Sequence, residues 1–168
     1  CDKTGWAPHH LIVEQGKRIL GACPMYLKSH SMGEFVFDQQ WAGYAMQTGI
    51  EYYPKILVGV PFTPVAGSRF LTVPGIERRN IIAVLGRALI EICRSNKLSS
   101  IHINFCDQEE MDALRDLDFI PKIGLQFHWE NREYKTFDDY LGAFRSERRN
   151  KIKRERRELY KQGIRVRA

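Results

Sequence analysis

The segment QFHWEN, residues 126–131, alternates polar and aromatic side chains around a histidine. In a β-strand, Gln126, His128 and Glu130 would lie on one face and the two aromatic residues on the other. Histidine titrates near neutral pH, so His128 could serve there as a catalytic proton shuttle. The pattern predicts either the floor of a cleft backed by the core or a solvated sheet face with a histidine at its edge.

Asp38 is a second candidate for acid–base chemistry. It directly precedes a short helix predicted over residues 39–48, with Trp41, Ala45 and Met46 on its buried face. An aspartate at this position is more often the N-cap of the helix, because its side chain can accept a hydrogen bond from a free backbone N–H. Both interpretations of Asp38 stay open.

His102 alternates with isoleucines in a strand predicted over residues 100–105 (SIHINF). A lone histidine in a strand is more often structural, with a catalytic role as the alternative. No Cys/His pair has the spacing of metal ligands, so we expect no metal site. The sequence contains neither GxxxxGK[ST] nor GxGxxG and gives no support for nucleotide binding by such loops.

A nearly continuous apolar run, residues 56–60 (ILVGV), predicts a central strand covered on both faces. Pro61, Pro64 and Gly67 follow and predict an irregular, bulged exit from the strand. Backbone N–H and C=O groups that lack ladder partners there could bind an extended ligand. An ordinary strand exit with two prolines is the alternative.

The remaining segments predict an α/β fold with a mixed sheet and helices on both faces. Pro24 indicates an edge or a bulge in the second strand of an N-terminal hairpin. The expected elements are strands at residues 10–14, 18–28, 119–120 and 125–129, helices at residues 77–96 and 107–117, and a helical turn at residues 137–142.

Residues 145–167 hold eleven of the 26 basic side chains and three of the 20 acidic ones. The rest of the chain has slightly more acidic than basic side chains, so the net charge of +6 comes from residues 145–167. We expect a basic helix ending near Gln162, with a narrow apolar stripe of Leu141, Ile152 and Leu159. Its charge favours phosphate groups of a ligand, RNA, DNA or an anionic membrane, or else a solvated helix between two domains.

With 168 residues and 43% hydrophobic residues, the chain can build one domain with a core. It has no apolar run long enough for a membrane span and no signal peptide. The cysteines lie in apolar surroundings and favour buried, reduced thiols over disulfides, so we expect a cytoplasmic protein. Cys1 in first position and the start of a strand predicted at residues 164–168 suggest a segment of a longer protein.

Several separated motifs together resemble the FemAB-like branch of the GNAT acyltransferase superfamily, whose members are often labelled peptidoglycan biosynthesis or recognition proteins. The motifs are GEFVFD at residues 33–38 with Trp41-Ala42, YYPK at residues 52–55, VPFTPV at residues 60–65, QFHW at residues 126–129, and FDDYL at residues 137–141 before the basic helix. They occur in order and span nearly the whole chain.

The resemblance implies a GNAT-like mixed sheet over residues 1–142, whose central strands splay to admit an acyl donor. Residues 143–168 would then connect to a second GNAT-like domain of the same chain. Related Fem transferases use aminoacyl-tRNA as donor, whereas other GNAT enzymes bind acetyl-CoA through an Arg/Gln-x-x-Gly-x-Gly/Ala loop. In this chain residues 61–79 occupy the position of that loop, and they lack the Arg/Gln-x-x-Gly-x-Gly/Ala signature. Acyl-CoA and aminoacyl-tRNA are therefore the donors considered, with tRNA as a partner.

Three interpretations follow: an acyl or aminoacyl transferase acting on an amine, a non-catalytic domain that recognises an anionic ligand or RNA, and a structural half-domain. For the transferase, the catalytic candidates are His128, Asp38 and His102. The residues expected to bind donor or substrate are Tyr53, Lys55, Phe62, Thr63, Arg69, Gln126, Trp129, Asn131, Arg145, Arg148 and Arg149.

Overall fold

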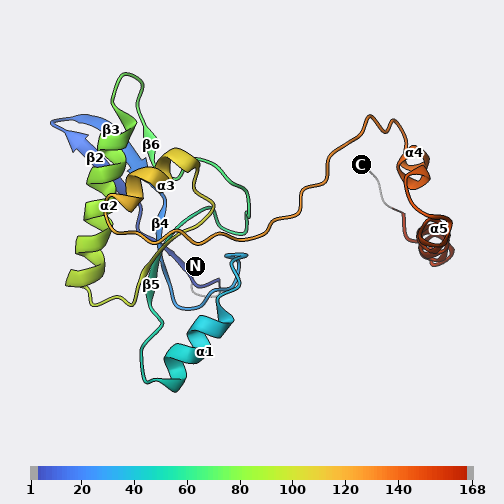
Figure 1. The fold of residues 1–168 in the computed structure, drawn as a ribbon, viewed down its shortest axis with the longest axis horizontal. Helices are drawn as coiled ribbons and strands as arrows, with labels where there is room; N and C mark the ends of the chain where they lie inside the picture. Colours follow the sequence, from blue (N-terminus) through green and yellow to red (C-terminus); the bar gives the residue numbers. More distant parts are fainter. Residues whose placement is uncertain (1–3, 166–168) are drawn as a thin grey trace. The chain divides into compact units, whose positions relative to one another are not determined.

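A computed structural model describes residues 4–165 of the chain, which divides into two compact units, Cys1–Lys122 and Ile123–Ala168 (Figure 1). The first unit contains both sheets and the helices α1 to α3, and the second contains α4 and α5. The expected mixed α/β architecture is confirmed. No helix within residues 4–165 is long and apolar enough to cross a membrane.

A four-stranded mixed sheet forms the centre of the first unit. Its strands are β1 (Trp6–Pro8), β4 (Met25–Lys28), β5 (Lys55–Val58) and β7 (Ile101–Ile103), in that order across the sheet. The pairs β1/β4 and β4/β5 are antiparallel, whereas β5 and β7 run parallel. All four residues of β5 are buried, as predicted for a central strand.

A second, antiparallel sheet contains β2 (Leu11–Gln15), β3 (Arg18–Cys23) and β6 (Leu71–Thr72). The single strand predicted over residues 18–28 is therefore two strands in different sheets. Proline has no N–H for a ladder, and Pro24 lies at the break between β3 and β4.

The long helix α2 (Arg78–Ser95) and the short helix α3 (Gln108–Arg115) supply one side of the core. Leu85 and Leu89 of α2 and Leu114 of α3 pack with Ile56 and Val58 of β5. Because side chains alternate along a strand, Lys55 and Leu57 point to the opposite face of the sheet.

The short helix α1 (Gln39–Gln47) differs from its prediction. Ala45 is its buried residue, whereas Trp41 and Met46 are exposed. The expected burial of those two side chains is wrong. The segment before α1 is anchored to the sheet by polar contacts, and the helix itself turns its large apolar side chains outward.

The second unit contains α4 (Phe137–Gly142) and α5 (Ser146–Lys161). The helical turn predicted at residues 137–142 is confirmed, and a capping box between Thr136 and Asp139 fixes its start. Residues 119–120 and 125–129 form no strand. Their prediction is wrong, because the apolar side chains of the alternating pattern are exposed and have no partner strand.

The predicted apolar stripe of the basic helix is only partly buried. Leu141 is buried within α4, whereas Ile152 is half-buried and Leu159 is 46% exposed. Ile164 and Arg165 are not in a strand, and the rest of the strand expected at residues 164–168 lies outside the described residues. The charge of α5 thus covers nearly its whole surface.

Candidate active site

The face of the central sheet opposite α2 carries a polar cluster. The pairing of β4 with β5 places Lys28 beside Lys55, and the pairing of β5 with β7 places Leu57 beside His102. Both lysine side chains are fully buried. Two adjacent buried ammonium groups repel each other, so this face requires carboxylates from elsewhere in the chain.

The segment between β4 and α1 supplies these carboxylates. Lys55 Nζ lies 2.6 Å from Asp38 Oδ2 and 3.0 Å from Glu34 Oε2. It also donates to Ser31 Oγ at 2.9 Å. The four buried charges of Lys28, Lys55, Glu34 and Asp38 balance, which is the condition for keeping such groups away from water.

Asp38 accepts three hydrogen bonds in this ion cluster, as many as Lys55 donates. Its Oδ2 accepts hydrogen bonds from Ser31 Oγ at 2.8 Å and from Tyr52 OH at 2.9 Å in addition to Lys55. Burial acts to raise the pKa of Asp38, but the bonds from Lys55, Ser31 and Tyr52 outweigh it and hold the pKa below its ordinary value. Asp38 occupies the N-cap position of α1, yet its side chain makes no cap hydrogen bond, so that expectation is wrong.

Tyr52 and Tyr53, which lie shortly before β5 in the sequence, also contact the ion cluster. Tyr53 OH lies 2.7 Å from Ser31 Oγ. The Tyr52 ring stands edge-on to Tyr53, and Lys55 Nζ lies 5.2 Å and 5.5 Å from the two ring centroids. Burial and the hydrogen bond to Asp38 raise the pKa of Tyr52 far above its ordinary value, so Tyr52 stays a neutral donor.

Lys28 is held in a different way. Its Nζ lies 4.1 Å from the centroid of the Trp6 ring and donates to Met32 O at 3.0 Å. Burial lowers the pKa of Lys28 to about 8, opposed by Glu34 and assisted by the charge of Lys55. The indole N–H of Trp6 donates to the same carbonyl, Met32 O, at 3.2 Å. The cluster therefore fixes the backbone of residues 31–38 as well as its side chains.

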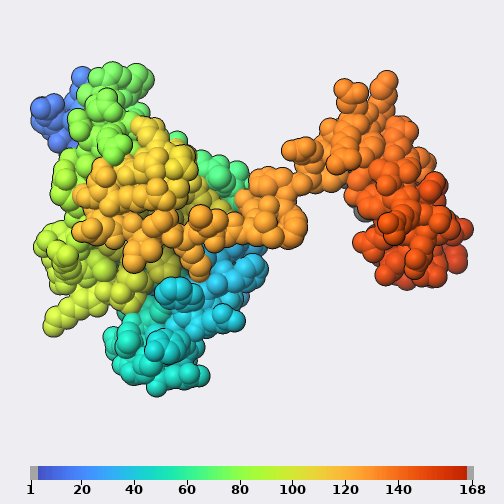
Figure 2. All heavy atoms as spheres, in the orientation of Figure 1, coloured from blue at the N-terminus to red at the C-terminus, as the bar shows by residue number. Residues whose placement is uncertain are grey.

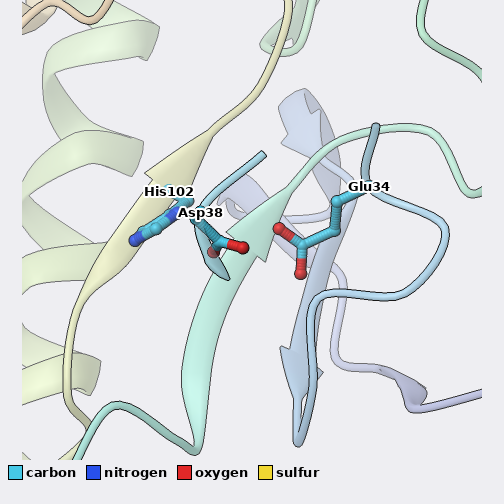
Figure 3. Close-up of side chains that lie close together, drawn as sticks. All are labelled: Glu34, Asp38 and His102. Carbon is cyan, nitrogen blue, oxygen red and sulfur yellow. The ribbon is translucent and has the colours of Figure 1, made fainter. Parts of the chain in front are cut away.

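His102 contributes a neutral imidazole to the edge of the cluster (Figure 3). Burial, followed by the charge of Lys55, lowers the pKa of His102 to about 4. Glu34, Asp38 and His102 each place one potential ligand atom within 4.8 Å of the others. The Lys55 ammonium already contacts both carboxylates, and Lys28 and Lys55 together balance their charge, so the cluster fits these ammonium groups better than a divalent cation.

Two carboxylate oxygens of the cluster remain without a partner. Glu34 Oε1 and Asp38 Oδ1 are buried and accept no hydrogen bond within the described residues. Burial raises the pKa of Glu34 against the opposing effect of Lys55. Asp38 Oδ1 is therefore a hydrogen-bond acceptor that none of the donors in the cluster uses.

The ladder between the parallel strands β5 and β7 ends directly beyond this cluster. Their last paired residues are Val58 and Ile103, and Asn104 N still donates to Val58 O at 3.0 Å. The chain then leaves β5 through an uncharged loop and returns at Gly67, whose N–H donates to Phe105 O at 3.0 Å. Ligands in open α/β sheets bind at the carboxyl ends of the strands.

Asn104, which was not among the predicted site residues, directly follows β7. Its side-chain Nδ2 is buried without an acceptor among the described residues. Phe62 and Phe105 have φ values of 56° and 57°, a region that non-glycine residues rarely occupy. One feature of the sequence could have identified Asn104 as a candidate site residue. It is a polar residue directly after β7, the strand that runs parallel to the buried strand β5.

The loop residues predicted to bind a ligand have distinct positions. Phe62 N donates to Gly33 O at 3.2 Å, which joins the loop to the segment before α1. Thr63 is exposed and its hydroxyl donates to Pro61 O. The buried Arg69 guanidinium donates to Asn104 O at 2.8 Å and to the carbonyls of Val65 and Ser68. Arg69 thus holds the loop from inside.

The remaining predicted site residues belong to the second unit. Gln126, His128 and Trp129 are exposed in an irregular segment, and the Trp129 ring lies 5.9 Å from that of Tyr140. Asn131 Oδ1 accepts from Tyr134 N at 2.8 Å.

Arg145 is the N-cap residue of α5, and Arg148 is exposed. Arg149 Nη2 donates to Phe144 O at 3.4 Å, while its Nε is buried without a partner in residues 4–165. Of the predicted residues, the structure gathers Asp38, His102, Lys55 and Tyr53 into one cluster.

Comparison with known proteins gives the chain its family. The family model described as FemAB-like, peptidoglycan biosynthesis/recognition, matches residues 1–168. The chain therefore belongs to the FemAB-like family, in agreement with the resemblance drawn from its motifs. No curated protein and no solved structure matches it significantly. The family links the chain to the biosynthesis or recognition of peptidoglycan.

Proposed function

We propose that this chain is a GNAT-like transferase domain that moves an acyl or aminoacyl group to an amine in peptidoglycan or related cell-envelope metabolism. The observation that carries the proposal is a buried amide donor, Asn104 Nδ2, which lies where the β5/β7 ladder ends and has no acceptor among the described residues. The family description supports the same metabolic setting.

In the proposed reaction, the nitrogen of the acceptor amine attacks the carbonyl carbon of the donor. An N–C bond forms, and the C–O bond of an aminoacyl-tRNA ester or the C–S bond of an acyl-CoA breaks. The amine proton passes to a base, and the leaving oxygen or sulfur takes up a proton. Such a reaction depends on positioning, a proton acceptor and stabilisation of the oxyanion.

The roles of the residues follow from their surroundings. Asn104 Nδ2 is a donor suited to a carbonyl oxygen or an oxyanion. Asp38 is an ionised carboxylate that keeps Oδ1 for a substrate N–H. His102, with its pKa of about 4, is a weak base and orients rather than deprotonates. His128, a residue of the second unit, remains the proton acceptor proposed from the sequence. Arg145, Arg148 and Arg149 would bind donor phosphates.

A transfer assay on the full chain tests this proposal. The donors are acetyl-CoA and total aminoacyl-tRNA, the acceptor is a lysine-containing peptidoglycan peptide, and mass spectrometry detects the acylated product. We expect product with one donor, loss of at least tenfold in rate for Asp38→Asn and His128→Ala, and no change for the exposed His9→Gln. The proposed activity would be overturned if neither donor gave a product. It would also be overturned if Asp38→Asn and His128→Ala both left the rate unchanged.

The second candidate function is recognition of an anionic ligand or RNA without chemistry. It is favoured by α5, whose cations are mostly directed to solvent. Among its described basic residues, Lys153 pairs with Asp138, Lys161 pairs with Glu158, and Arg156 stacks on the Phe137 ring. Binding to a single-stranded RNA should weaken steeply as salt rises, and Arg154→Ala with Arg157→Ala should reduce the salt slope.

A further inference from the structure

Helix α3 supplies a buried carboxylate that has no role in the proposed reaction so far. Figures 1 and 2 show α3, in yellow and orange, at the surface of the first unit, but the Glu110 side chain is fully buried. Its Oε2 accepts from Asp107 N at 3.3 Å and completes the capping box of the helix. Its Oε1 accepts from Arg78 Nη2 at 2.6 Å and from the backbone N–H groups of Arg69 at 2.6 Å and Phe70 at 2.7 Å. The carboxylate therefore joins α3 to a segment about 40 positions earlier in the chain.

Arg69 extends this anchoring to the loop that follows β5. Its buried guanidinium donates from Nε to Asn104 O at 2.8 Å, and its two other nitrogens donate to Val65 O and Ser68 O. Burial lowers the pKa of Arg69, and the charge of Glu110 opposes this shift. Because the guanidinium is a rigid planar fork, it holds the carbonyls that accept from it in one geometry.

The backbone of Asn104 is held on both sides. Its N–H donates to Val58 O at 3.0 Å, and its carbonyl oxygen accepts from Arg69. The carbonyl oxygen of the next residue, Phe105, accepts from Gly67 N at 3.0 Å. With the backbone fixed in this way, the direction of the Asn104 amide depends on two side-chain torsions. A displacement of the Arg69 guanidinium would therefore move the amide as well.

We propose that Glu110 and Arg69 are positioning residues for the amide of Asn104. Glu110 fixes the backbone of Arg69, and the Arg69 guanidinium fixes the carbonyl of Asn104, so Nδ2 is oriented before a substrate carbonyl arrives. Arg69, expected from the sequence to bind donor or substrate, acts instead through Asn104. The inference rests on the proposed transferase function, in which the amide stabilises an oxyanion. Such a donor acts by its orientation, and a misplacement of about 1 Å can cost about 100-fold in rate.

Nuclear magnetic resonance on the full chain tests the positioning without any acyl donor. The signals of the Asn104 side-chain amide are identified by their loss in Asn104→Asp, and their rate of hydrogen exchange is measured. We expect Arg69→Lys to raise this rate at least tenfold, because an ammonium cannot hold three carbonyls in the geometry of the guanidinium. Gly21→Ala, whose Cβ would lie 2.4 Å from Ile81 Cγ2, is the destabilised control and should change the rate less than twofold. An unchanged rate in Arg69→Lys would overturn the proposal.

Glu110→Gln is the second variant, for the case that Arg69→Lys does not fold. A glutamine has one acceptor oxygen where the carboxylate has two, so it cannot serve both Asp107 N and the N–H groups of Arg69 and Phe70. We expect the exchange rate of the Asn104 amide to rise at least threefold. An unchanged rate in this variant would overturn the role of Glu110.

A double-mutant cycle on the transfer rate separates positioning from general stabilisation of the fold. With the donor that supports transfer, Asn104→Ala and Arg69→Lys should each lower kcat at least tenfold, whereas Gly21→Ala should leave it unchanged. In the Asn104→Ala background, Arg69→Lys should lower kcat less than twofold further, because a positioning residue has no effect once the group that it positions is absent. The same loss in both backgrounds would overturn the proposal.

Failure of the proposed function gives a different pattern of results. If neither donor gives a product while Arg69→Lys still raises the exchange rate of the Asn104 amide, the reaction is refuted and the positioning of the amide stands. If transfer occurs and Arg69→Lys changes neither the exchange rate nor kcat, the positioning is refuted and the reaction stands.

Discussion

Lys55 of β5 and Asp38 at the start of α1 form a buried ion pair with 2.6 Å between Nζ and Oδ2. The pair joins residues that are 17 positions apart and ties the segment before α1 to the centre of the sheet. Asp38 Oδ1, the substrate acceptor of the proposed function, belongs to the same carboxylate. A single contact thus positions this oxygen and the segment before α1.

Replacement of Lys55 by Met should strongly destabilise the first unit. The change leaves Glu34 and Asp38 buried with one ammonium fewer, which costs about 3–5 kcal/mol when one partner of a buried pair is removed. Urea denaturation followed by circular dichroism measures this loss. The exposed Lys17→Met is the matched control and should change nothing. Equal stability of the two variants would refute the importance of the cluster.

The pH dependence of stability should report on His102. Its pKa is about 4 in the folded chain and about 6.5 when unfolded, so between these values the unfolded chain binds more protons. Acidification from pH 6.5 to 4 therefore destabilises the fold, by at most about 3 kcal/mol. His102→Gln should remove this part of the pH dependence, whereas the exposed His9→Gln should retain it. Identical profiles for all three proteins would show that His102 titrates normally.

The adjacent residues Arg78 and Arg79 should differ sharply in their effect on stability. Arg78 Nη2 contacts Asp107 at 2.8 Å and the fully buried Glu110 at 2.6 Å, which joins α2 to α3. Because Arg78 is partly exposed, we expect Arg78→Ala to cost about 2 kcal/mol. Arg79 makes an exposed pair with Asp116, so Arg79→Ala should leave the melting temperature unchanged. A similar loss in both variants would contradict this difference.

Two glycines provide a test of packing with opposite expected signs. A Cβ at Gly21 of β3 would lie 2.4 Å from Ile81 Cγ2 and 2.8 Å from the backbone oxygen of Leu71. Gly21→Ala should therefore destabilise by about 1–3 kcal/mol. A Cβ at Gly43 of α1 would meet nothing within 4 Å, so Gly43→Ala should stabilise by up to about 1 kcal/mol through helix propensity. Thermal unfolding gives both values.

Much of the fold could be predicted where a signal is local. The apolar run at residues 56–60 indicated the buried strand β5, and the alternation around His102 indicated β7. Helical spacing indicated α2 to within a residue or two. Pro24 marked a break that the structure places between two sheets. The short strands β1 and β6 were missed, since two or three residues carry no readable period.

The same local patterns failed where burial depends on distant partners. The alternation at residues 125–129 predicts a strand, but no strand pairs with it and its apolar side chains are exposed. The apolar spacing in α1 predicts a buried face that would include Trp41, yet the anchored loop turns that residue to solvent. A periodic pattern identifies a face of an element and says nothing about what covers it.

The sequence by itself determined the element types, the family and the basic composition of residues 145–167, because periodicity, motifs and charge are properties of the chain. Only the tertiary structure decided that Lys28 and Lys55 are buried, since a lysine leaves water when carboxylates from another segment compensate its charge. The same holds for the amide of Asn104, which has no acceptor among the described residues and lies where the β5/β7 ladder ends. These groups owe their chemistry to long-range pairing, and no local pattern encodes it.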